Sequence, residues 1–336
     1  MSIQFTNIVS NLPASVPFVG PEAQERAIKQ LFKARIGANE SVFGPSEKAI
    51  LAMQKELSKT WMYGDPENYD LKHALAIKHN VQFENIIVGE GIDGLLGYLV
   101  RLFIEKGDNV VTTDGAYPTF NYHVEGFGGQ LYKVPFSNDT EDLENLLKKV
   151  KEKSAKILYV SNPNNPMGTI NKPSNIESLI KNLPKTTLLC LDEAYIDFVD
   201  SQLIPKISLN TKNVIRMRTF SKAYGMAGLR VGYAIGEKEL ILNFEKIRNH
   251  FGMSRVSQVG ALAALEDNKF ISNVVNKVAL TRNRIIEIAT RNNCNFIPSF
   301  TNFVAIDCLN DSKFAKRVLD NLINKGVFVR MPYSSP

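Results

Sequence analysis

The sequence predicts an α/β protein whose large domain has a mostly parallel sheet covered by helices on both faces, with a smaller α/β domain formed by both chain ends. Short apolar, β-branched runs alternate with amphipathic helical windows through the middle of the chain, which is typical of a sheet with helical crossovers. The runs are apolar throughout, as expected for parallel strands that are buried on both faces. After Gly236 the pattern changes to long helical windows, which indicates a second structural unit.

The central part of the chain carries the strands of the predicted large sheet. Helical windows at 92–105, 139–153 and 175–181 separate several of them. Because a helical crossover returns the chain to the same end of the sheet, the strands that it joins should run parallel. The seven strand-like runs lie at 85–89, 109–113, 130–134, 156–161, 187–192, 213–219 and 229–235.

The two ends of the chain carry the elements of the predicted small domain. A helix at 21–32 comes first and is followed by a turn-rich loop. Further helices are expected at 237–249, 254–266, 269–292 and 312–325, with strand-like runs at 303–307 and 327–330. We therefore predict a large domain at 46–245 and a small domain made of residues 1–45 and 246–336.

The composition excludes several classes of protein. With 336 residues, 44% hydrophobic and 22% charged, the chain can bury a sizeable core and is not disordered. The net charge of +6 is spread out and not interleaved with aromatic residues, so no nucleic-acid partner is expected. The longest apolar stretch, 94–104, is too short to span a membrane. The three cysteines lack CxxC spacing, so we expect neither a disulfide framework nor a metal site. The same observation predicts a reducing, cytoplasmic location.

The first candidate motif is the glycine-rich turn GEGIDG at 89–94, which follows a strand-like run and opens a helix. Such a turn exposes main-chain N–H groups that can bind a phosphate at the helix N-terminus. The motif also fits a dinucleotide fingerprint, with Asp114 as the acidic residue at the end of the next strand. A tight turn without a ligand is the third interpretation.

The second motif is SNPNNPMG at 161–168, directly after a strand-like run. Its prolines and glycine predict a sharp loop at the carboxyl end of a strand, where α/β sheets bind ligands. Asn165 would present its side-chain amide there. A plain turn of the same composition is equally consistent with these residues.

The third motif is DEAY at 192–195, at the end of a buried strand-like run. A carboxylate in that position needs a positive or proton-donating partner, so Asp192 is a candidate contact for a charged ligand. Tyr195 could donate its hydroxyl. The competing interpretation is that Asp192 caps the next helix.

The fourth motif, TFSKAYGMAGLR at 219–230, combines a strand end, a glycine-spaced turn and two cations. A lysine held in such a site loses its proton readily and can form an imine with a carbonyl, which makes Lys222 a candidate nucleophile. Arg230 has a guanidinium suited to phosphate, and Ser221 lies beside the lysine. An ordinary surface loop is the alternative.

Taken in order, GEGIDG, NPNNPMG, DEAY and SKAYGMAGLRVGY resemble the fold-type-I pyridoxal-phosphate aminotransferases over nearly the whole chain. The NES and YGDPEN segments are similar to the histidinol-phosphate aminotransferase branch of that family. The resemblance implies pyridoxal 5'-phosphate as the cofactor and Lys222 as its covalent anchor. It implies that an amino group passes from histidinol phosphate or an aromatic amino acid to 2-oxoglutarate, as in histidine biosynthesis.

The resemblance also implies roles for further residues. Asp192 would pair with the ring nitrogen of the cofactor, Tyr195 and Asn165 would bond its phenolic oxygen, and Tyr117 would stack on the ring. The phosphate would be held by residues of the two glycine-rich segments, namely Gly91, Ile92, Asp93, Ser221 and Arg230. Tyr63 would reach the cofactor of a neighbouring subunit, which implies a homodimer. Asn39 and Arg330 would contact the substrate.

Other functions share some of these residues. A decarboxylase or lyase of the same fold would also use Lys222 and Asp192. The alternative of a nicotinamide-dependent dehydrogenase is supported only by GEGIDG and Asp114. A regulator that binds the cofactor without catalysis would fit the C-terminal end, where the family usually continues with a strand that carries an arginine for the substrate carboxylate. On that comparison we expect the C-terminal end of the small domain to be incomplete.

Overall fold

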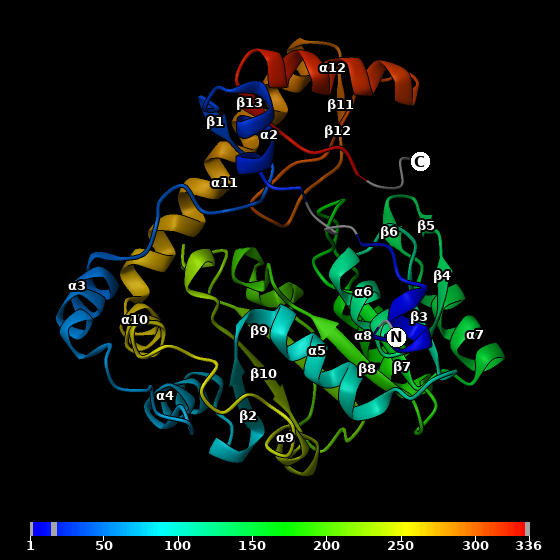
Figure 1. The fold of residues 1–336 in the computed structure, drawn as a ribbon. Coiled ribbons are helices and arrows are strands. Elements are labelled where there is room, and N and C mark those ends of the chain that lie inside the picture. Colours follow the sequence, from blue (N-terminus) through cyan, green and yellow to red (C-terminus); the bar gives the residue numbers. More distant parts are fainter. Residues whose placement is uncertain (1–2, 15–18, 333–336) are drawn as a thin grey trace.

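The computed structural model describes residues 3–14 and 19–332 and has a seven-stranded sheet at its centre (Figure 1). All seven strands expected in the large domain are present within a few residues of their predicted bounds. Their order across the sheet is β2 (Ile86–Gly89), β10 (Gly232–Gly236), β9 (Val214–Thr219), β8 (Leu188–Asp192), β7 (Ile157–Ser161), β3 (Asn109–Thr113) and β4 (Gln130–Val134). The predicted α/β class with a mostly parallel sheet is confirmed.

One strand of this sheet runs against the others. β10 is antiparallel to both of its neighbours, β2 and β9, whereas every other pair is parallel. The carboxyl ends of β2, β9, β8, β7, β3 and β4 therefore meet at one edge of the sheet, where β10 begins. This edge is called the C-edge below.

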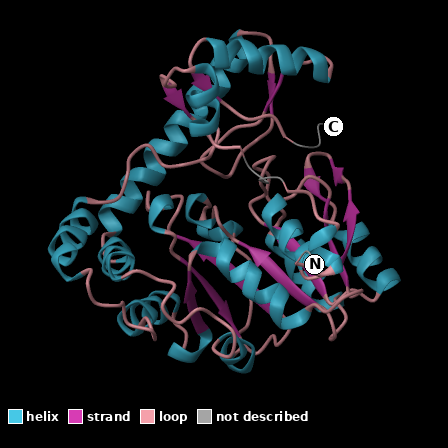
Figure 2. Ribbon diagram, in the orientation of Figure 1, coloured by secondary structure: helices cyan, strands magenta, loops and turns pink. Residues whose placement is uncertain are grey.

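Helices cover both faces of the sheet (Figure 2). One face packs against α5 (Gly91–Phe103), α6 (Pro118–Gly126) and α9 (Lys238–Phe244). The other face packs against α4 (Tyr69–His79) and α10 (Arg255–Leu265) at one end and α7 (Leu143–Lys153) and α8 (Pro173–Asn182) at the other. Alternate residues of the strands supply the two faces, since Ile87 joins the first core and Ile86 and Val88 the second, as the pleat requires.

Four α-helices of the structure were not predicted: the four-residue α1 (Asn7–Ser10), α3 (Glu47–Glu56), α4 and α6. Ser46 caps α3 by accepting from the amide of Ala49 at 3.2 Å. The sequence of α6 is PTFNYHVEG, which holds few strong helix formers. It begins with Pro118 at its first position, where the absent N–H costs nothing, and it buries Phe120 and Val124 against α5. Tertiary packing thus outweighs weak local propensity.

Segments from both parts of the chain, α2 with β1 and the elements from α11 onward, meet in a smaller assembly at the top of Figure 1, whereas α1 lies against α6 of the large sheet. β1 (Ala34–Arg35) pairs in parallel with β13 (Val327–Phe328), and β11 (Asn295–Phe296) pairs antiparallel with β12 (Ile306–Asp307). The strands expected at 303–307 and 327–330 are thus only two residues long. The long helix α11 (Asn268–Arg291) runs from α10 to this assembly. Its other elements are α2 (Pro21–Ile28) and α12 (Ser312–Asn324).

The remaining elements are short. They are α1 (Asn7–Ser10), β5 (Phe136–Ser137), β6 (Thr140–Glu141) and the 3-10 helices Leu57–Lys59, Phe83–Asn85, Ile196–Phe198, Ser201–Leu203 and Ala227–Leu229. In the part of the chain that the structure describes, no helix is both long and apolar enough to cross a membrane.

Candidate active site

Most of the candidate residues lie at the C-edge of the sheet. Gly91 is the first residue of α5, two positions after the end of β2. Asn165 lies in the loop after β7, and Asp192 is the last residue of β8. Lys222 follows β9, and Arg230 stands just before β10. Because the carboxyl ends of parallel strands meet at one edge, segments far apart in the sequence come together here.

Two glycines allow β10 to approach the first turn of α5. Gly91 has φ +78°, and a Cβ built on it would collide with the Arg230 guanidinium. A Cβ on Gly232 would lie 2.6 Å from the Gly91 carbonyl carbon and the Ile92 nitrogen. Arg230, itself at φ +53°, donates from Nη1 to the Ser221 hydroxyl at 3.4 Å. The main-chain N–H groups of α5, a hydroxyl and a guanidinium therefore converge, which forms a cradle for an anion.

Asp93, in the first turn of α5, has one carboxylate oxygen that is buried without a hydrogen-bond partner. The Nε2 atom of His123 on α6 lies 3.6 Å from this oxygen. The His123 nitrogen likewise lacks a hydrogen-bond partner among the described residues. These orphaned polar atoms beside the anion cradle indicate a site shaped for a polar ligand.

Asp192 is 5% exposed at the end of β8. Its Oδ2 atom accepts from the Tyr159 hydroxyl at 2.6 Å, and its Oδ1 atom accepts from the amide of Ala194 at 2.9 Å. Burial raises the pKa of Asp192, while the Tyr159 hydroxyl and the Lys222 charge act in the opposite direction. A cationic group of a ligand placed beside Asp192 would stabilise the ionised carboxylate.

The carboxylate that follows Asp192 is held differently. Glu193 is 1% exposed and forms ion pairs with Arg216 at 2.9 Å and Arg218 at 2.8 Å, both from β9. Burial acts to raise the pKa of Glu193, but the two guanidinium groups outweigh it and lower that pKa. The sequence analysis did not identify this cluster, although two arginines at alternate positions of an apolar strand were the available signal.

The Lys222 amine lies among main-chain carbonyls and an aromatic ring. It donates to the carbonyls of Asn39 at 3.2 Å and Ala38 at 3.5 Å, and it lies 5.5 Å from the centroid of the Tyr195 ring. Burial lowers its pKa from 10.5 to about 8, and the charge of Arg230 acts in the same direction. A lysine with this pKa is partly unprotonated near neutral pH and can act as a nucleophile or a base.

The Tyr195 hydroxyl joins two asparagines. It accepts from the side-chain amides of Asn39 at 3.2 Å and Asn165 at 3.4 Å. Burial raises its pKa, so Tyr195 keeps its proton and can donate it to a ligand oxygen. Asn39, Asn165, Tyr195 and Lys222 thus form one connected cluster.

The other candidates lie around this cluster or apart from it. Tyr117 caps α6 and is half-buried against the first core; burial raises its pKa, and Asp93 and Asp192 act in the same direction. The charge of Arg330 acts to lower the pKa values of Lys222 and Tyr195, so it lies within electrostatic reach of the cluster. Tyr63 is not brought to the C-edge.

The side chain of Tyr63 is 77% exposed and packs against Phe251 with ring centroids 4.9 Å apart. Trp61 beside it is 82% exposed. Within one chain, therefore, Tyr63 takes no part in the site.

Sheet order excludes the dinucleotide interpretation of GEGIDG. That fold needs the strand after the glycine turn to lie beside the strand before it. β2 is bonded only to β10 and is separated from β3 by four strands, β10, β9, β8 and β7. Asp114, which follows β3, is therefore not placed to bind the ribose of a dinucleotide held at Gly91.

Sequence reasoning missed a buried carboxyl group that supports the asparagine loop. Glu141, in β6, accepts from the side-chain amide of Asn164 at 2.8 Å and from the amide of Ser161 at 3.2 Å. Burial raises its pKa to about 8. No sequence pattern singles out Glu141, because it comes from a two-residue strand that only the fold brings beside β7.

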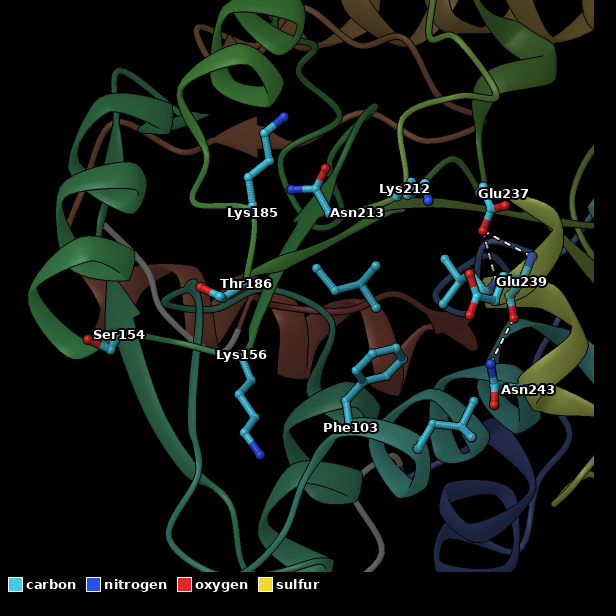
Figure 3. A pocket seen from close by; sticks show the side chains of 13 residues that line it. Phe103, Ser154, Lys156, Lys185, Thr186, Lys212, Asn213, Glu237, Glu239 and Asn243 are labelled. Carbon is cyan, nitrogen blue, oxygen red and sulfur yellow. Dashed lines mark hydrogen bonds between the residues drawn. The ribbon is translucent and has the colours of Figure 1, made fainter.

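The surface hollow in Figure 3 lies elsewhere. It has a volume of about 700 Å³ and lies at the opposite end of the strands, between Lys156 before β7 and Glu237 after β10. None of the candidate residues lines it. In the described ranges, 3–14 and 19–332, no three His, Cys, Asp or Glu side chains are grouped so that they could hold a metal ion.

Comparisons with known proteins agree with this geometry. Residues 33–336 match the family model described as "Aminotransferase class I and II". The chain is 33% identical over 311 residues to a histidinol-phosphate aminotransferase of Moorella thermoacetica, which covers 91% of this chain and 79% of that one. It is 34% identical over 304 residues to the protein of the same name from Staphylococcus haemolyticus, with 89% and 85% covered.

Solved structures give the same result. The histidinol-phosphate aminotransferase of Sinorhizobium meliloti, in complex with pyridoxal-5'-phosphate, superposes with a TM-score of 0.96 at 47% identity and covers 100% of this chain and 91% of that one. A putative histidinol-phosphate aminotransferase of Erwinia carotovora has a TM-score of 0.83 at 27% identity, with 89% and 87% covered. Aspartate aminotransferase of Thermus thermophilus with maleate, at 21% identity and a TM-score of 0.82, covers 98% and 92% and shares the fold.

Proposed function

Because the chain belongs to the class I and II aminotransferases, we propose that it is a pyridoxal-phosphate-dependent enzyme that moves an amino group from histidinol phosphate to 2-oxoglutarate. An aromatic amino acid is the second candidate donor. The observation that carries the proposal is the position of Asp192, at the end of β8, and of Lys222, just after the neighbouring strand β9, at the edge of the sheet that also holds the anion cradle. Similarity to the Sinorhizobium enzyme supports both the cofactor and the donor.

The residues present fit this cofactor. The cradle of Gly91, Ile92, Ser221 and Arg230 suits its phosphate, since a Cβ at Gly91 would fill the space beside the guanidinium. Asp93 takes part through its main-chain N–H, because an ionised side chain there would repel a phosphate. Asp192 suits a protonated ring nitrogen, and the Tyr195 hydroxyl with the Asn165 amide suits the phenolic oxygen.

When bound, the cofactor supplies an electron sink that stabilises negative charge developing on the α-carbon of the substrate. Lys222 would hold it covalently, and its amine would then serve as the base that takes the α-proton of the substrate and returns a proton during transfer. The lowered pKa of Lys222 favours both tasks near neutral pH. Tyr117, at the start of α6, would cover the ring face, and Asp192 would keep the ring nitrogen protonated.

Residues from both chain ends complete the substrate side. We assign Asn39 and Arg330 to substrate contact, because Asn39 bonds Tyr195 and Arg330 acts electrostatically on Lys222. We propose that 46–245 serve as the cofactor domain and that 1–45 with 246–336 serve as the substrate domain.

We propose a homodimer, in which the exposed Tyr63 ring reaches the partner's cofactor phosphate. The free cysteines suit a cytoplasmic enzyme.

Half-reaction spectra with a panel of amino donors test this function. We expect histidinol phosphate to convert the bound cofactor to its amine form with the highest ratio of rate to KM, and 2-oxoglutarate to reverse the change. Aromatic amino acids should follow at lower efficiency. Release of carbon dioxide, or elimination without formation of an oxo product, would instead support a decarboxylase or a lyase.

A further inference from the structure

A pair of cysteines lies at the base of a hairpin whose tip enters the candidate active site. The hairpin consists of β11, a loop and β12 (Figure 1). Asn295 pairs with Asp307 and Phe296 with Ile306 in antiparallel register. One step further in the same register, Cys294 stands opposite Cys308. Both thiols are free and half-buried, whereas Cys190 is fully buried in the core.

The hydrogen bonds of the hairpin show whether Cys294 and Cys308 occupy a hydrogen-bonded or a non-hydrogen-bonded position of the antiparallel ladder. The amide of Ile297 donates to the carbonyl of Ala305 at 2.9 Å, and in an antiparallel ladder hydrogen-bonded and non-hydrogen-bonded pairs alternate. Counting outward from 297 and 305, residues 294 and 308 form a non-hydrogen-bonded pair. Such pairs have Cα atoms about 4.5 Å apart, which falls within the separation of about 4.4–6.8 Å that a disulfide spans.

The effect of one thiol on the other agrees with this placement. Burial raises the pKa of Cys308, and the nearby Cys294 and Asp307 raise it further. The Cys294 sulfur makes only a long contact of 3.7 Å, to the carbonyl of Asn292. Among the residues that the structure describes, neither thiol forms another side-chain hydrogen bond or an ion pair.

The tip of the hairpin joins the site through three contacts. The amide of Phe300 donates to the carbonyl of Gly168 at 2.8 Å. Asn302 donates its side-chain amide at 2.9 Å to the Asn39 carbonyl that also accepts from Lys222. Phe303 lies edge-on to the Tyr195 ring, with centroids 5.4 Å apart. A covalent link at the base would therefore constrain a segment that positions Asn39 and Tyr195.

We propose that Cys294 and Cys308 form a redox modification site, an intramolecular dithiol that a low-molecular-weight disulfide converts to a cystine and a thiol reductant restores. The thiolate of Cys294 attacks the small disulfide and releases one thiolate, which takes up a proton. The thiolate of Cys308 then attacks the mixed disulfide and releases the second. Two protein thiols are oxidised and one disulfide is reduced to two thiols. This is a single reversible pair, distinct from the stabilising disulfide framework that the cysteine spacing argued against.

Oxidised glutathione, added to the purified full chain, tests the site. We expect wild-type protein to lose two hydrogens in its intact mass, to carry no adduct, and to regain its mass with dithiothreitol. Cys308→Ser should retain a glutathione adduct on Cys294, because the second exchange has no thiol. Cys190→Ser is the matched control and should behave as wild type. A stable adduct on wild-type protein, a disulfide between two chains, or no reaction would overturn the proposal.

Hydrogen exchange tests whether the bond constrains the hairpin. The ladder of β11 and β12 is only two residues long, so its amides exchange by local opening. Oxidation should slow exchange of the Ile297 amide by about tenfold, since closing the 294–308 loop removes most of its open conformations. Cys308→Ser treated in the same way should show no slowing. An Ile297 amide that exchanges equally fast in oxidised wild type would refute the constraint even where the disulfide forms.

Discussion

Replacing Gly91 with alanine adds a single Cβ atom to the proposed phosphate site and so tests whether that site binds the cofactor phosphate. The added Cβ would occupy the position of the Arg230 guanidinium and displace it from the anion. A hydrogen bond to a charged group is worth about 1.5–3 kcal/mol. The dissociation constant for pyridoxal phosphate should therefore rise by about 10- to 150-fold, measured by absorbance titration of the cofactor-free enzyme. Affinity for pyridoxal, which lacks the phosphate, should change far less.

The chain offers a matched control for the backbone strain. Alanine at the positive φ of Gly91 also costs about 1–2 kcal/mol of stability, independently of any ligand. Gly107 has φ +93° and no atom within 4 Å of a Cβ, so Gly107→Ala carries the strain without the collision. Both variants should lose similar unfolding free energy in denaturant, and only Gly91→Ala should lose phosphate-dependent affinity. Equal cofactor affinities in the two variants would refute the cradle.

Three further predictions concern the reacting groups and the assembly. Asp192→Asn should lower the transamination rate by about 100-fold, on the order of one buried charged contact. Its effect on stability should be smaller, because Tyr159 can still donate to the amide oxygen and only the hydrogen bond from the Ala194 amide is lost. A rate near that of the parent would contradict the role of Asp192. In cofactor-free enzyme, acetylation of Lys222 should rise with pH around a midpoint near 8, as the free amine replaces the ammonium. Asp192→Asn should move that midpoint to lower pH, since the carboxylate raises the pKa of Lys222. A midpoint near 10.5 in the parent enzyme would show that burial does not lower the pKa of Lys222. Tyr63→Ala and Lys222→Ala should complement each other when mixed and reassembled. Half of the dimers would be hybrids with one intact site, so about a quarter of the parent activity should return, and none should return if Tyr63 acts within its own chain.

The sheet was predictable because its strands carry strong local signals, whereas its order was not. Continuous β-branched runs mark buried strands regardless of direction, so nothing in 229–235 showed that β10 runs antiparallel. The strand order, which the sequence does not show either, places β2 at the edge of the sheet beside β10. It thereby separates Gly91 from Asp114, and the dinucleotide interpretation could be excluded only once the order was known.

Within the site, the residues that belong to sequence motifs were predictable. The residues that contact and position them were not. Lys222, Asp192 and Asn165 stand at strand ends with distinctive neighbours in the sequence. Glu141 supports the asparagine loop from a two-residue strand, and Asn302 and Phe303 enter from a hairpin of the chain ends. These contacts depend on packing between distant segments, which the local pattern of one sequence does not encode.

The central claim is that Lys222 anchors pyridoxal phosphate at the C-edge. Reduction of the loaded enzyme with borohydride fixes the cofactor on its lysine, and peptide mass spectrometry identifies the residue. We expect one label per chain, on the peptide that contains Lys222, and none on that peptide in Lys222→Ala. A label on any other lysine, or no label at all, would contradict the assignment and the function built on it.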